Sequence, residues 1–78
     1  MNMELAILTE LESAHPRMLK RSVLEAELRL QTEDFALTTF DRALVALEKK
    51  RQIRIYPGED VIRVAITDEG LNRVAATR

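Results

Sequence analysis

The sequence predicts an α+β domain in which three helices precede a β-hairpin and a fourth helix follows it. Apolar residues recur at helical spacing in residues 3–14 and 38–50, which predicts amphipathic helices. Apolar and polar residues alternate on both sides of the turn-forming segment Pro57–Asp60, which predicts two paired strands. With 78 residues, of which 46% are hydrophobic, the chain is expected to form a single domain over residues 1–78.

The first helix is expected over about residues 3–14. Its apolar side chains form a stripe that faces away from three glutamates. The helix should end at His15, because the residue before a proline is disfavoured in the α region. The apolar stripe consists of Met3, Ile7, Leu8 and Leu11, and the glutamates are Glu4, Glu10 and Glu12.

Residues 17–21 are expected to form a short extended connector before the second helix. Ser22 and Glu25 have the spacing of a capping box, so the second helix should begin at Ser22 and end near Gln31. A polar turn follows, which Phe35 and Leu37 are expected to anchor to the core.

The third helix is expected over residues 38–50, with Thr38 as its N-cap and Asp41 placed favourably against the helix dipole. The side of this helix that faces the core consists of Phe40, Ala43, Leu44 and Leu47. The hairpin should then run over residues 53–66. If Pro57–Asp60 form its turn, Arg54 lies directly opposite Arg63, and Ile62 faces the core. Thr67 is expected to cap a last helix over residues 68–76.

This order of elements, with basic residues where the third helix meets the hairpin, is typical of a winged helix-turn-helix. Two segments carry a closer resemblance, Leu44-Val-Ala-Leu47-Glu48 and Ile66-Thr67-Asp68-Glu69-Gly70. They resemble the end of the recognition helix and the start of the following helix in the DNA-binding domains of MarR-type and PadR-type bacterial regulators. Arg51 stands where those families usually have glycine. A left-handed cap would be strained for arginine, so we expect the helix to end differently here.

Composition restricts the function classes. The chain has one histidine, no cysteine, no glycine-rich phosphate loop and no nucleophile motif, so we expect no enzyme, no cofactor and no metal site. Residues 1–16 hold three glutamates and no Lys or Arg, so we expect no signal peptide, and the absence of cysteine favours a reducing, cytoplasmic location. No apolar run approaches the ~20 residues that cross a bilayer.

The net charge is only −1, yet residues 42–63 hold six positive side chains against three negative ones. This asymmetry permits a nucleic-acid face. If the third helix enters a major groove, residues near its start would contact bases or phosphates. Arg54 and Arg63, placed opposite each other, would repel unless phosphates lay between them. The candidate DNA-binding residues are therefore Thr38, Thr39, Arg42, Lys49, Lys50, Arg51, Arg54 and Arg63.

Other interpretations stay open for the same residues. The third helix could present only a solvated face, and Glu48, Glu59 or Asp60 could neutralise the two arginines. A one-residue shift of the hairpin register would also remove their repulsion. The leading hypothesis is a small regulator that binds double-stranded DNA as a homodimer, with the first or last helix as dimer face. The alternative is a protein-interaction module that uses the apolar, exposed pair Val45 and Ala46 and binds no DNA.

Overall fold

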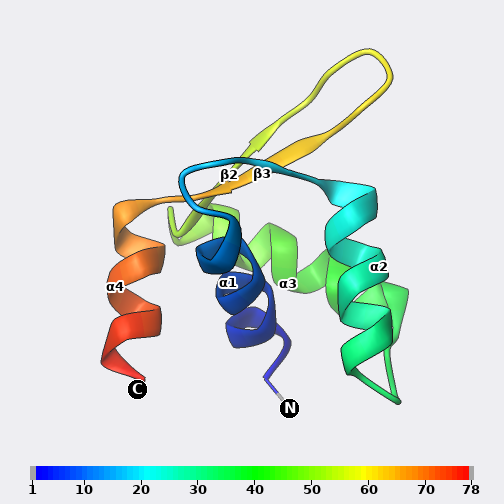
Figure 1. Ribbon diagram of the computed structural model, residues 1–78, viewed down its shortest axis with the longest axis horizontal. Helices are drawn as coiled ribbons and strands as arrows, with labels where there is room; N and C mark the ends of the chain where they lie inside the picture. The colour runs from blue at the N-terminus through cyan, green and yellow to red at the C-terminus, as the bar shows by residue number, and fades with distance from the viewer. Residues whose placement is uncertain (1, 78) are drawn as a thin grey trace.

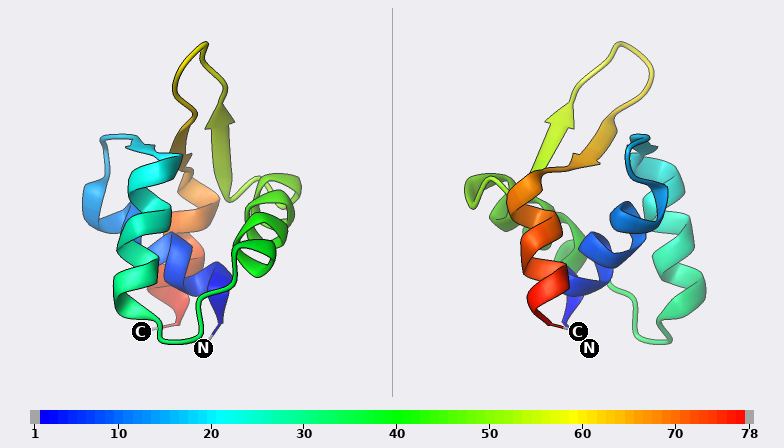
Figure 2. Two further views of the ribbon diagram at one scale, coloured as in Figure 1. Left: turned by 90° about the vertical axis from the view of Figure 1, so that its right-hand side faces the viewer. Right: turned by 60° about the vertical axis from the view of Figure 1, so that its left-hand side comes forward.

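The computed structural model describes residues 2–77, which form four helices and one three-stranded antiparallel sheet (Figure 1). All four helices lie on one side of the sheet, and the β2–β3 hairpin projects beyond them (Figure 2). The elements are α1 (Met3–Ala14), β1 (Leu19–Lys20), α2 (Arg21–Gln31), α3 (Leu37–Lys49), β2 (Ile53–Tyr56), β3 (Arg63–Ile66) and α4 (Asp68–Ala76).

Helix α1 is the centre of the packing and contacts α2, α3 and α4. Its expected bounds are confirmed, and the Asn2 side chain caps its first turn by accepting from the backbone N–H groups of Glu4 and Leu5. The apolar stripe faces the core, which is built from aliphatic side chains around the fully buried Phe40. Leu37 and Ile62, which were expected to face inward, are instead 44% and 42% exposed.

The second helix begins earlier than the capping box predicts, with its N-cap position two residues before Ser22. Ser22 is not its N-cap: α2 starts at Arg21, and Lys20 precedes it in an extended conformation without a side-chain cap. The cause is tertiary, because Lys20 belongs to strand β1 and the Arg21 N–H donates to the Ile62 carbonyl at 2.7 Å. The chain therefore passes directly from strand to helix.

The third helix also begins early. Thr38 is not its N-cap, because α3 starts at Leu37 after an extended Ala36. The Phe40 N–H donates to the Ala36 carbonyl at 3.0 Å, which places Thr38 inside the first turn. Asp41 consequently lies beyond the first turn and makes an ion pair with Arg21 of α2.

The sheet differs from the expected two-stranded hairpin in two respects. The connector supplies a third strand, β1, and the strand order is β1-β3-β2. The register is shifted by two residues, so that Arg54 lies opposite Ala65 and Tyr56 opposite Arg63. The predicted pairing of Arg54 with Arg63 is therefore wrong. A shift of two keeps every side chain on its own face of the sheet, so the alternation of apolar residues is unchanged between the two registers.

The junction of α3, β2 and α4 contains the one positive φ angle among residues 2–77. Arg51 has φ 60°, so the left-handed conformation that we expected arginine to avoid is in fact adopted. Hydrogen bonds hold the chain on both sides of it. The Gln52 N–H donates to the Leu47 carbonyl at 3.0 Å, and the Thr67 hydroxyl donates to the Arg51 carbonyl at 2.6 Å.

Thr67 caps α4 as predicted, since its side-chain oxygen accepts from the Gly70 N–H at 3.2 Å. Gly70 lies where α4 passes close to the chain after α3. A Cβ atom on Gly70 would come within 2.2 Å of the Gln52 carbonyl oxygen and 2.7 Å of Ile66 Cγ1. Only glycine therefore allows α4 to approach the end of α3 this closely.

Candidate nucleic-acid interface

Helix α3 presents one exposed line of side chains on the side away from the core. Residues three or four apart lie on the same side of a helix. Four residues follow one another at this spacing, and we call them the outward stripe: Thr38, Arg42, Val45 and Lys49. All four are exposed, Val45 by 53%, whereas the opposite side of α3 is buried in the core. Thr39, also exposed, lies beside the stripe.

The two cations of the outward stripe have no acidic partner in the described part of the chain. Arg42 and Lys49 form no ion pair among residues 2–77. Asp41, the nearest acid in sequence to Arg42, is already bound by Arg21, whose guanidinium also lies 5.3 Å from the centre of the Phe40 ring. The stripe therefore offers its positive charge to solvent.

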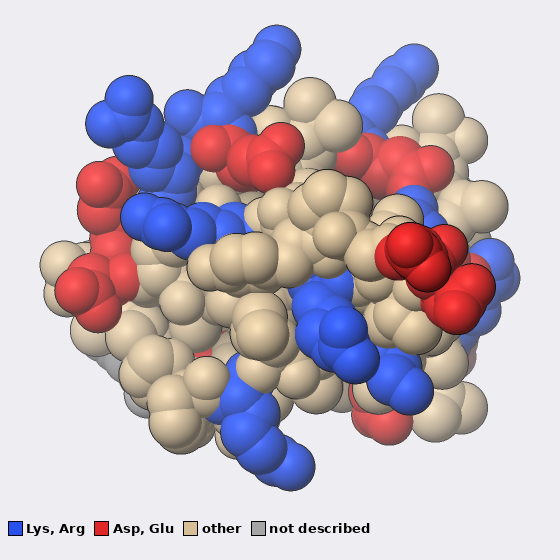
Figure 3. Space-filling view, turned by 90° about the horizontal axis from the view of Figure 1, so that it is seen from above, with Lys and Arg blue, Asp and Glu red and all other residues tan. Residues whose placement is uncertain are grey.

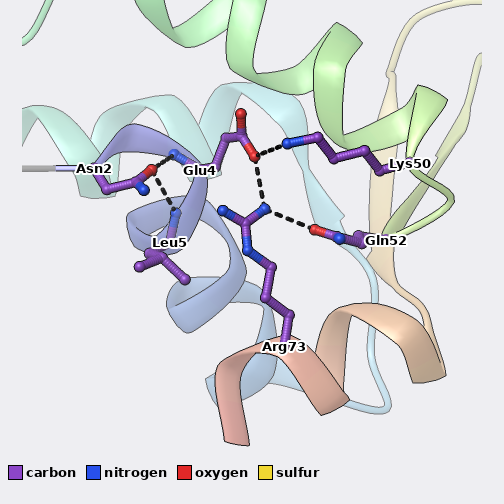
Figure 4. A network of polar contacts seen from close by, with 6 residues as sticks. All are labelled: Asn2, Glu4, Leu5, Lys50, Gln52 and Arg73. Atoms are coloured by element: carbon purple, nitrogen blue, oxygen red, sulfur yellow. Dashed lines mark hydrogen bonds and ion pairs between the residues drawn. The ribbon is translucent and has the colours of Figure 1, made fainter. Parts of the chain in front are cut away.

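Lys50 behaves differently from Lys49. Its Nζ atom lies 2.9 Å from Glu4 Oε1, so this predicted site residue is held against the start of α1 (Figure 4). Arg73 of α4 donates to the same oxygen at 2.6 Å and to Gln52 Oε1 at 2.8 Å. These four residues form what we call the Glu4 network: Glu4, Lys50, Gln52 and Arg73.

The sequence places Glu4 on the solvent side of α1, yet its side chain is only 23% exposed. Hydrogen bonds from Arg73 and then Lys50 lower the pKa of the Glu4 carboxyl below its ordinary value of 4.5, against a smaller opposing effect of burial. The network joins residues up to 69 positions apart in the chain, so spacing alone could not reveal it.

Arg51 and Arg54 lie in a groove along the outer edge of β2, between the end of α3 and the start of α4. Neither forms an ion pair among the described residues. The groove is nevertheless of mixed charge, because it is also lined by Glu48, Asp68 and Glu69.

The face of the sheet away from the helices brings the predicted site residues Arg54 and Arg63 together with Lys20 and Tyr56, a grouping that the sequence did not predict. Lys20 of β1 is directly opposite Arg63 of β3, and Arg63 is directly opposite Tyr56 of β2. Directly opposite residues of antiparallel strands point to the same face, so these three side chains form a row across the sheet. Arg54, two residues from Tyr56, lies diagonally from Arg63 on that face. The row was missed because β1 itself was not expected.

Positive charge does not form one continuous area on the top of the molecule. Figure 3 shows Lys and Arg side chains spread over this face, with acidic side chains between them and an uncharged band across the middle. Individual unpaired cations, rather than the net charge, are therefore the relevant feature.

Within residues 2–77 there is no group of three or more His, Cys, Asp or Glu side chains that could hold a metal ion. The helices of this same part of the chain are all too short or too polar to cross a lipid bilayer.

Comparison with known proteins gives one informative result. No protein-family model matches the sequence, and no curated protein matches it. Among solved structures, the chain is similar to a transcriptional regulator from Clostridium thermocellum, with a TM-score of 0.79 and 24% sequence identity. The similarity covers 96% of this chain and 75% of that chain. At this identity, the likeness shows a shared fold.

Proposed function

We propose that this chain is a small transcriptional regulator that binds double-stranded DNA through a winged helix-turn-helix. In this proposal α3 is the recognition helix and the β2–β3 hairpin is the wing. The observation that carries it is the outward stripe of α3, an exposed helix face with a hydroxyl and two unpaired cations. A helix with this chemistry suits a major groove, where arginine and threonine contact bases and phosphates.

The order of elements and the segment Ile66–Gly70 resemble the DNA-binding domains of MarR-type and PadR-type regulators. The fold shared with the regulator from Clostridium thermocellum supports a regulatory role. Both arguments concern the scaffold. The choice of DNA as partner rests on the outward stripe.

Roles for the predicted site residues follow from their positions. Thr38, Thr39 and Arg42 lie near the start of α3 and would contact base edges or phosphates. Lys49, Arg51 and Arg54 lie near the base of the hairpin and would contact the backbone of the same duplex. Lys50 would contribute least to DNA binding, because its ammonium group already forms an ion pair with Glu4. Arg63 lies on the outer face of the sheet.

A homodimer remains part of the proposal, because one domain of this kind reads few base pairs. Two copies of α3 would then lie about 34 Å apart, one turn of the duplex. The first and last helices, α1 and α4, were the expected dimer faces. In the described structure the large apolar side chains that are exposed lie on other elements, for example Val23 and Leu30 on α2. Sedimentation velocity, with and without duplex, would measure the stoichiometry.

The test is fluorescence anisotropy of a labelled generic duplex at two salt concentrations. We expect a non-specific Kd of about 10⁻⁴–10⁻⁶ M that weakens steeply with salt. The double variant Arg42→Ala, Lys49→Ala should weaken binding at least about tenfold and lower the slope of log K against log salt by roughly two, since each phosphate contact contributes about one. The exposed, uncharged change Asn72→Ala on α4 is the control and should bind as the parent does.

The alternative function is a protein-interaction module on the same scaffold. Its supporting observation is Val45, which is 53% exposed at the centre of the outward stripe. Absence of duplex binding at low salt would contradict the DNA proposal and leave this alternative. Duplex binding that the Arg42/Lys49 double variant does not weaken would contradict the assignment of α3 as the contacting helix.

A further inference from the structure

The outer face of the sheet carries a site that is separate from α3. Its three strands place Lys20, Arg63 and Tyr56 in one cross-strand row, and all three side chains are exposed. Their neighbours along the strands point to the opposite face, where Val64 is buried and Leu19 and Ile55 are partly buried against the core. The helices lie only on that opposite side of the sheet (Figures 1 and 2), and Lys20, Tyr56 and Arg63 are exposed to solvent.

The row contains like charges that no ion pair among residues 2–77 neutralises, although the acidic residues Glu48, Asp68 and Glu69 line the groove beside Arg54 and Tyr56. Lys20 and Arg63 are like charges directly opposite each other, an arrangement that destabilises a sheet. Arg54 adds a third cation diagonally from Arg63. No acidic residue occurs in β1, β2 or β3, and these three cations form no ion pair among residues 2–77. A ligand with several negative charges would relieve the repulsion.

Tyr56 narrows the chemistry of that ligand. Its side chain is 44% exposed and lies directly opposite Arg63. An exposed aromatic ring beside cations suits a nucleic-acid base that stacks on the ring while its phosphates meet the cations. In a duplex the faces of the bases are covered by their neighbours. An unpaired strand presents both the bases and the phosphates.

We propose that the outer face of the three-stranded sheet binds single-stranded nucleic acid, with Tyr56 stacking on a base and Lys20 and Arg63 contacting phosphates. Two strand spacings separate β1 from β2, about 10 Å, which accommodates a short stretch of unpaired nucleotides. The three contacts of this site lie on β1, β2 and β3 and are separate from the outward stripe of α3; Arg54, which the duplex proposal also uses, is not one of them.

The chain itself provides a direct probe. Tyr56 is the only tyrosine and there is no tryptophan, so tyrosine emission reports this position alone. Titration with a short oligothymidylate at low salt should quench the emission if a base stacks on the ring. Anisotropy of the labelled oligonucleotide gives the affinity in parallel, and an oligouridylate distinguishes a preference for RNA from one for DNA.

Three substitutions separate the contributions. Tyr56→Leu should weaken oligothymidylate binding about tenfold, whereas Tyr56→Phe, which keeps the ring, should bind nearly as the parent does. The pair Lys20→Ala, Arg63→Ala should weaken binding and lower the salt slope by roughly 1.4, since each contact with a single strand contributes about 0.7. The same pair should not lower the unfolding midpoint, because it removes a repulsion.

The Arg42→Ala, Lys49→Ala variant is the matched control. It removes two cations from α3 and should leave binding of the single strand unchanged. Absence of quenching, or equal affinities for the parent and Tyr56→Leu, would overturn the inference. If the parent protein binds the single strand but not the duplex, only the proposed function is overturned, so the two failures are distinguishable.

Discussion

Lys49 and Lys50 are adjacent in the chain, and the structure uses them in opposite ways. Lys50 is held by Glu4 in a network that joins α1, α3 and α4. Lys49 lies on the outward stripe with no acidic partner among the described residues. Both side chains are long and positively charged, so only the direction in which each leaves the end of α3 separates a structural role from an available one.

The same contrast recurs at the start of α2. Arg21 binds Asp41, lies 3.7 Å from Glu25 and stacks over Phe40. Lys20, one residue earlier, points away from the helices on the outer face of the sheet. In a chain of net charge −1, internal ion pairs hold some cations and leave others without an acidic partner among the described residues. A count of charges therefore underestimates what the surface can bind.

The largest expected effect on stability concerns the close contact between α4 and the chain after α3. Gly70→Ala would place a Cβ atom against the Gln52 carbonyl and force α4 away from the end of α3. We expect a loss of about 2–3 kcal/mol in the free energy of unfolding, because neither backbone segment can move freely. In thermal unfolding the midpoint should fall by roughly 10 °C or more. Asn72→Ala on the same helix is the control; an equal midpoint for the two variants would show that the contact is not tight.

A smaller effect tests the Glu4 network directly. Glu4→Gln removes the negative charge that Arg73 and Lys50 share, and we expect a loss of about 1 kcal/mol, reduced by the partial exposure of the side chains. Urea unfolding should show it as a lower midpoint with an unchanged slope. Lys50→Ala should also destabilise, whereas Lys49→Ala should change stability by less than about 0.5 kcal/mol. If the two lysine variants were equally stable, the comparison between them would fail.

The network also predicts a pH dependence. The pKa of Glu4 is lower in the folded protein, so the folded state favours the ionised carboxylate. Its stabilising contribution is present above the ordinary value of 4.5 and is lost as the pH falls through the lowered folded pKa. The stability difference between the parent and Glu4→Gln should therefore be constant near neutral pH and disappear in acid. A difference that persisted in acid would contradict an electrostatic origin.

The smallest effect concerns Arg51, an unpaired cation at the junction. Its φ of 60° is unfavourable for any residue with a Cβ atom, so Arg51→Gly should stabilise the protein by about 0.5–1 kcal/mol. Arg51→Ala keeps the strain while removing the charge, and should bring no such gain. Thermal unfolding of the parent, Arg51→Gly and Arg51→Ala at one pH separates the effect of backbone conformation on stability from that of charge. A lower midpoint for Arg51→Gly than for the parent would refute the argument from strain.

Sequence reasoning was most accurate where structure depends on near neighbours. All four helices were located, two from apolar periodicity and two from capping residues, and Thr67 was identified correctly as a cap. The caps assigned to Ser22 and Thr38 were wrong, because the actual N-cap positions, Lys20 at the end of β1 and the extended Ala36, each lie two residues earlier. The exposed face of α3 was predicted correctly, whereas the row of Lys20, Arg63 and Tyr56 was not.

Local chemistry thus determined the four helices and the two strands of the hairpin, since apolar spacing and turn residues act within a few positions of the chain, whereas β1 is a strand through its pairing with β3. Tertiary structure alone decided the hairpin register, because two registers that differ by two residues place the same side chains on the same faces. It also decided which cations are available, because a charge is neutralised by whichever acid the fold brings near. For Arg73 that acid is Glu4, 69 residues away.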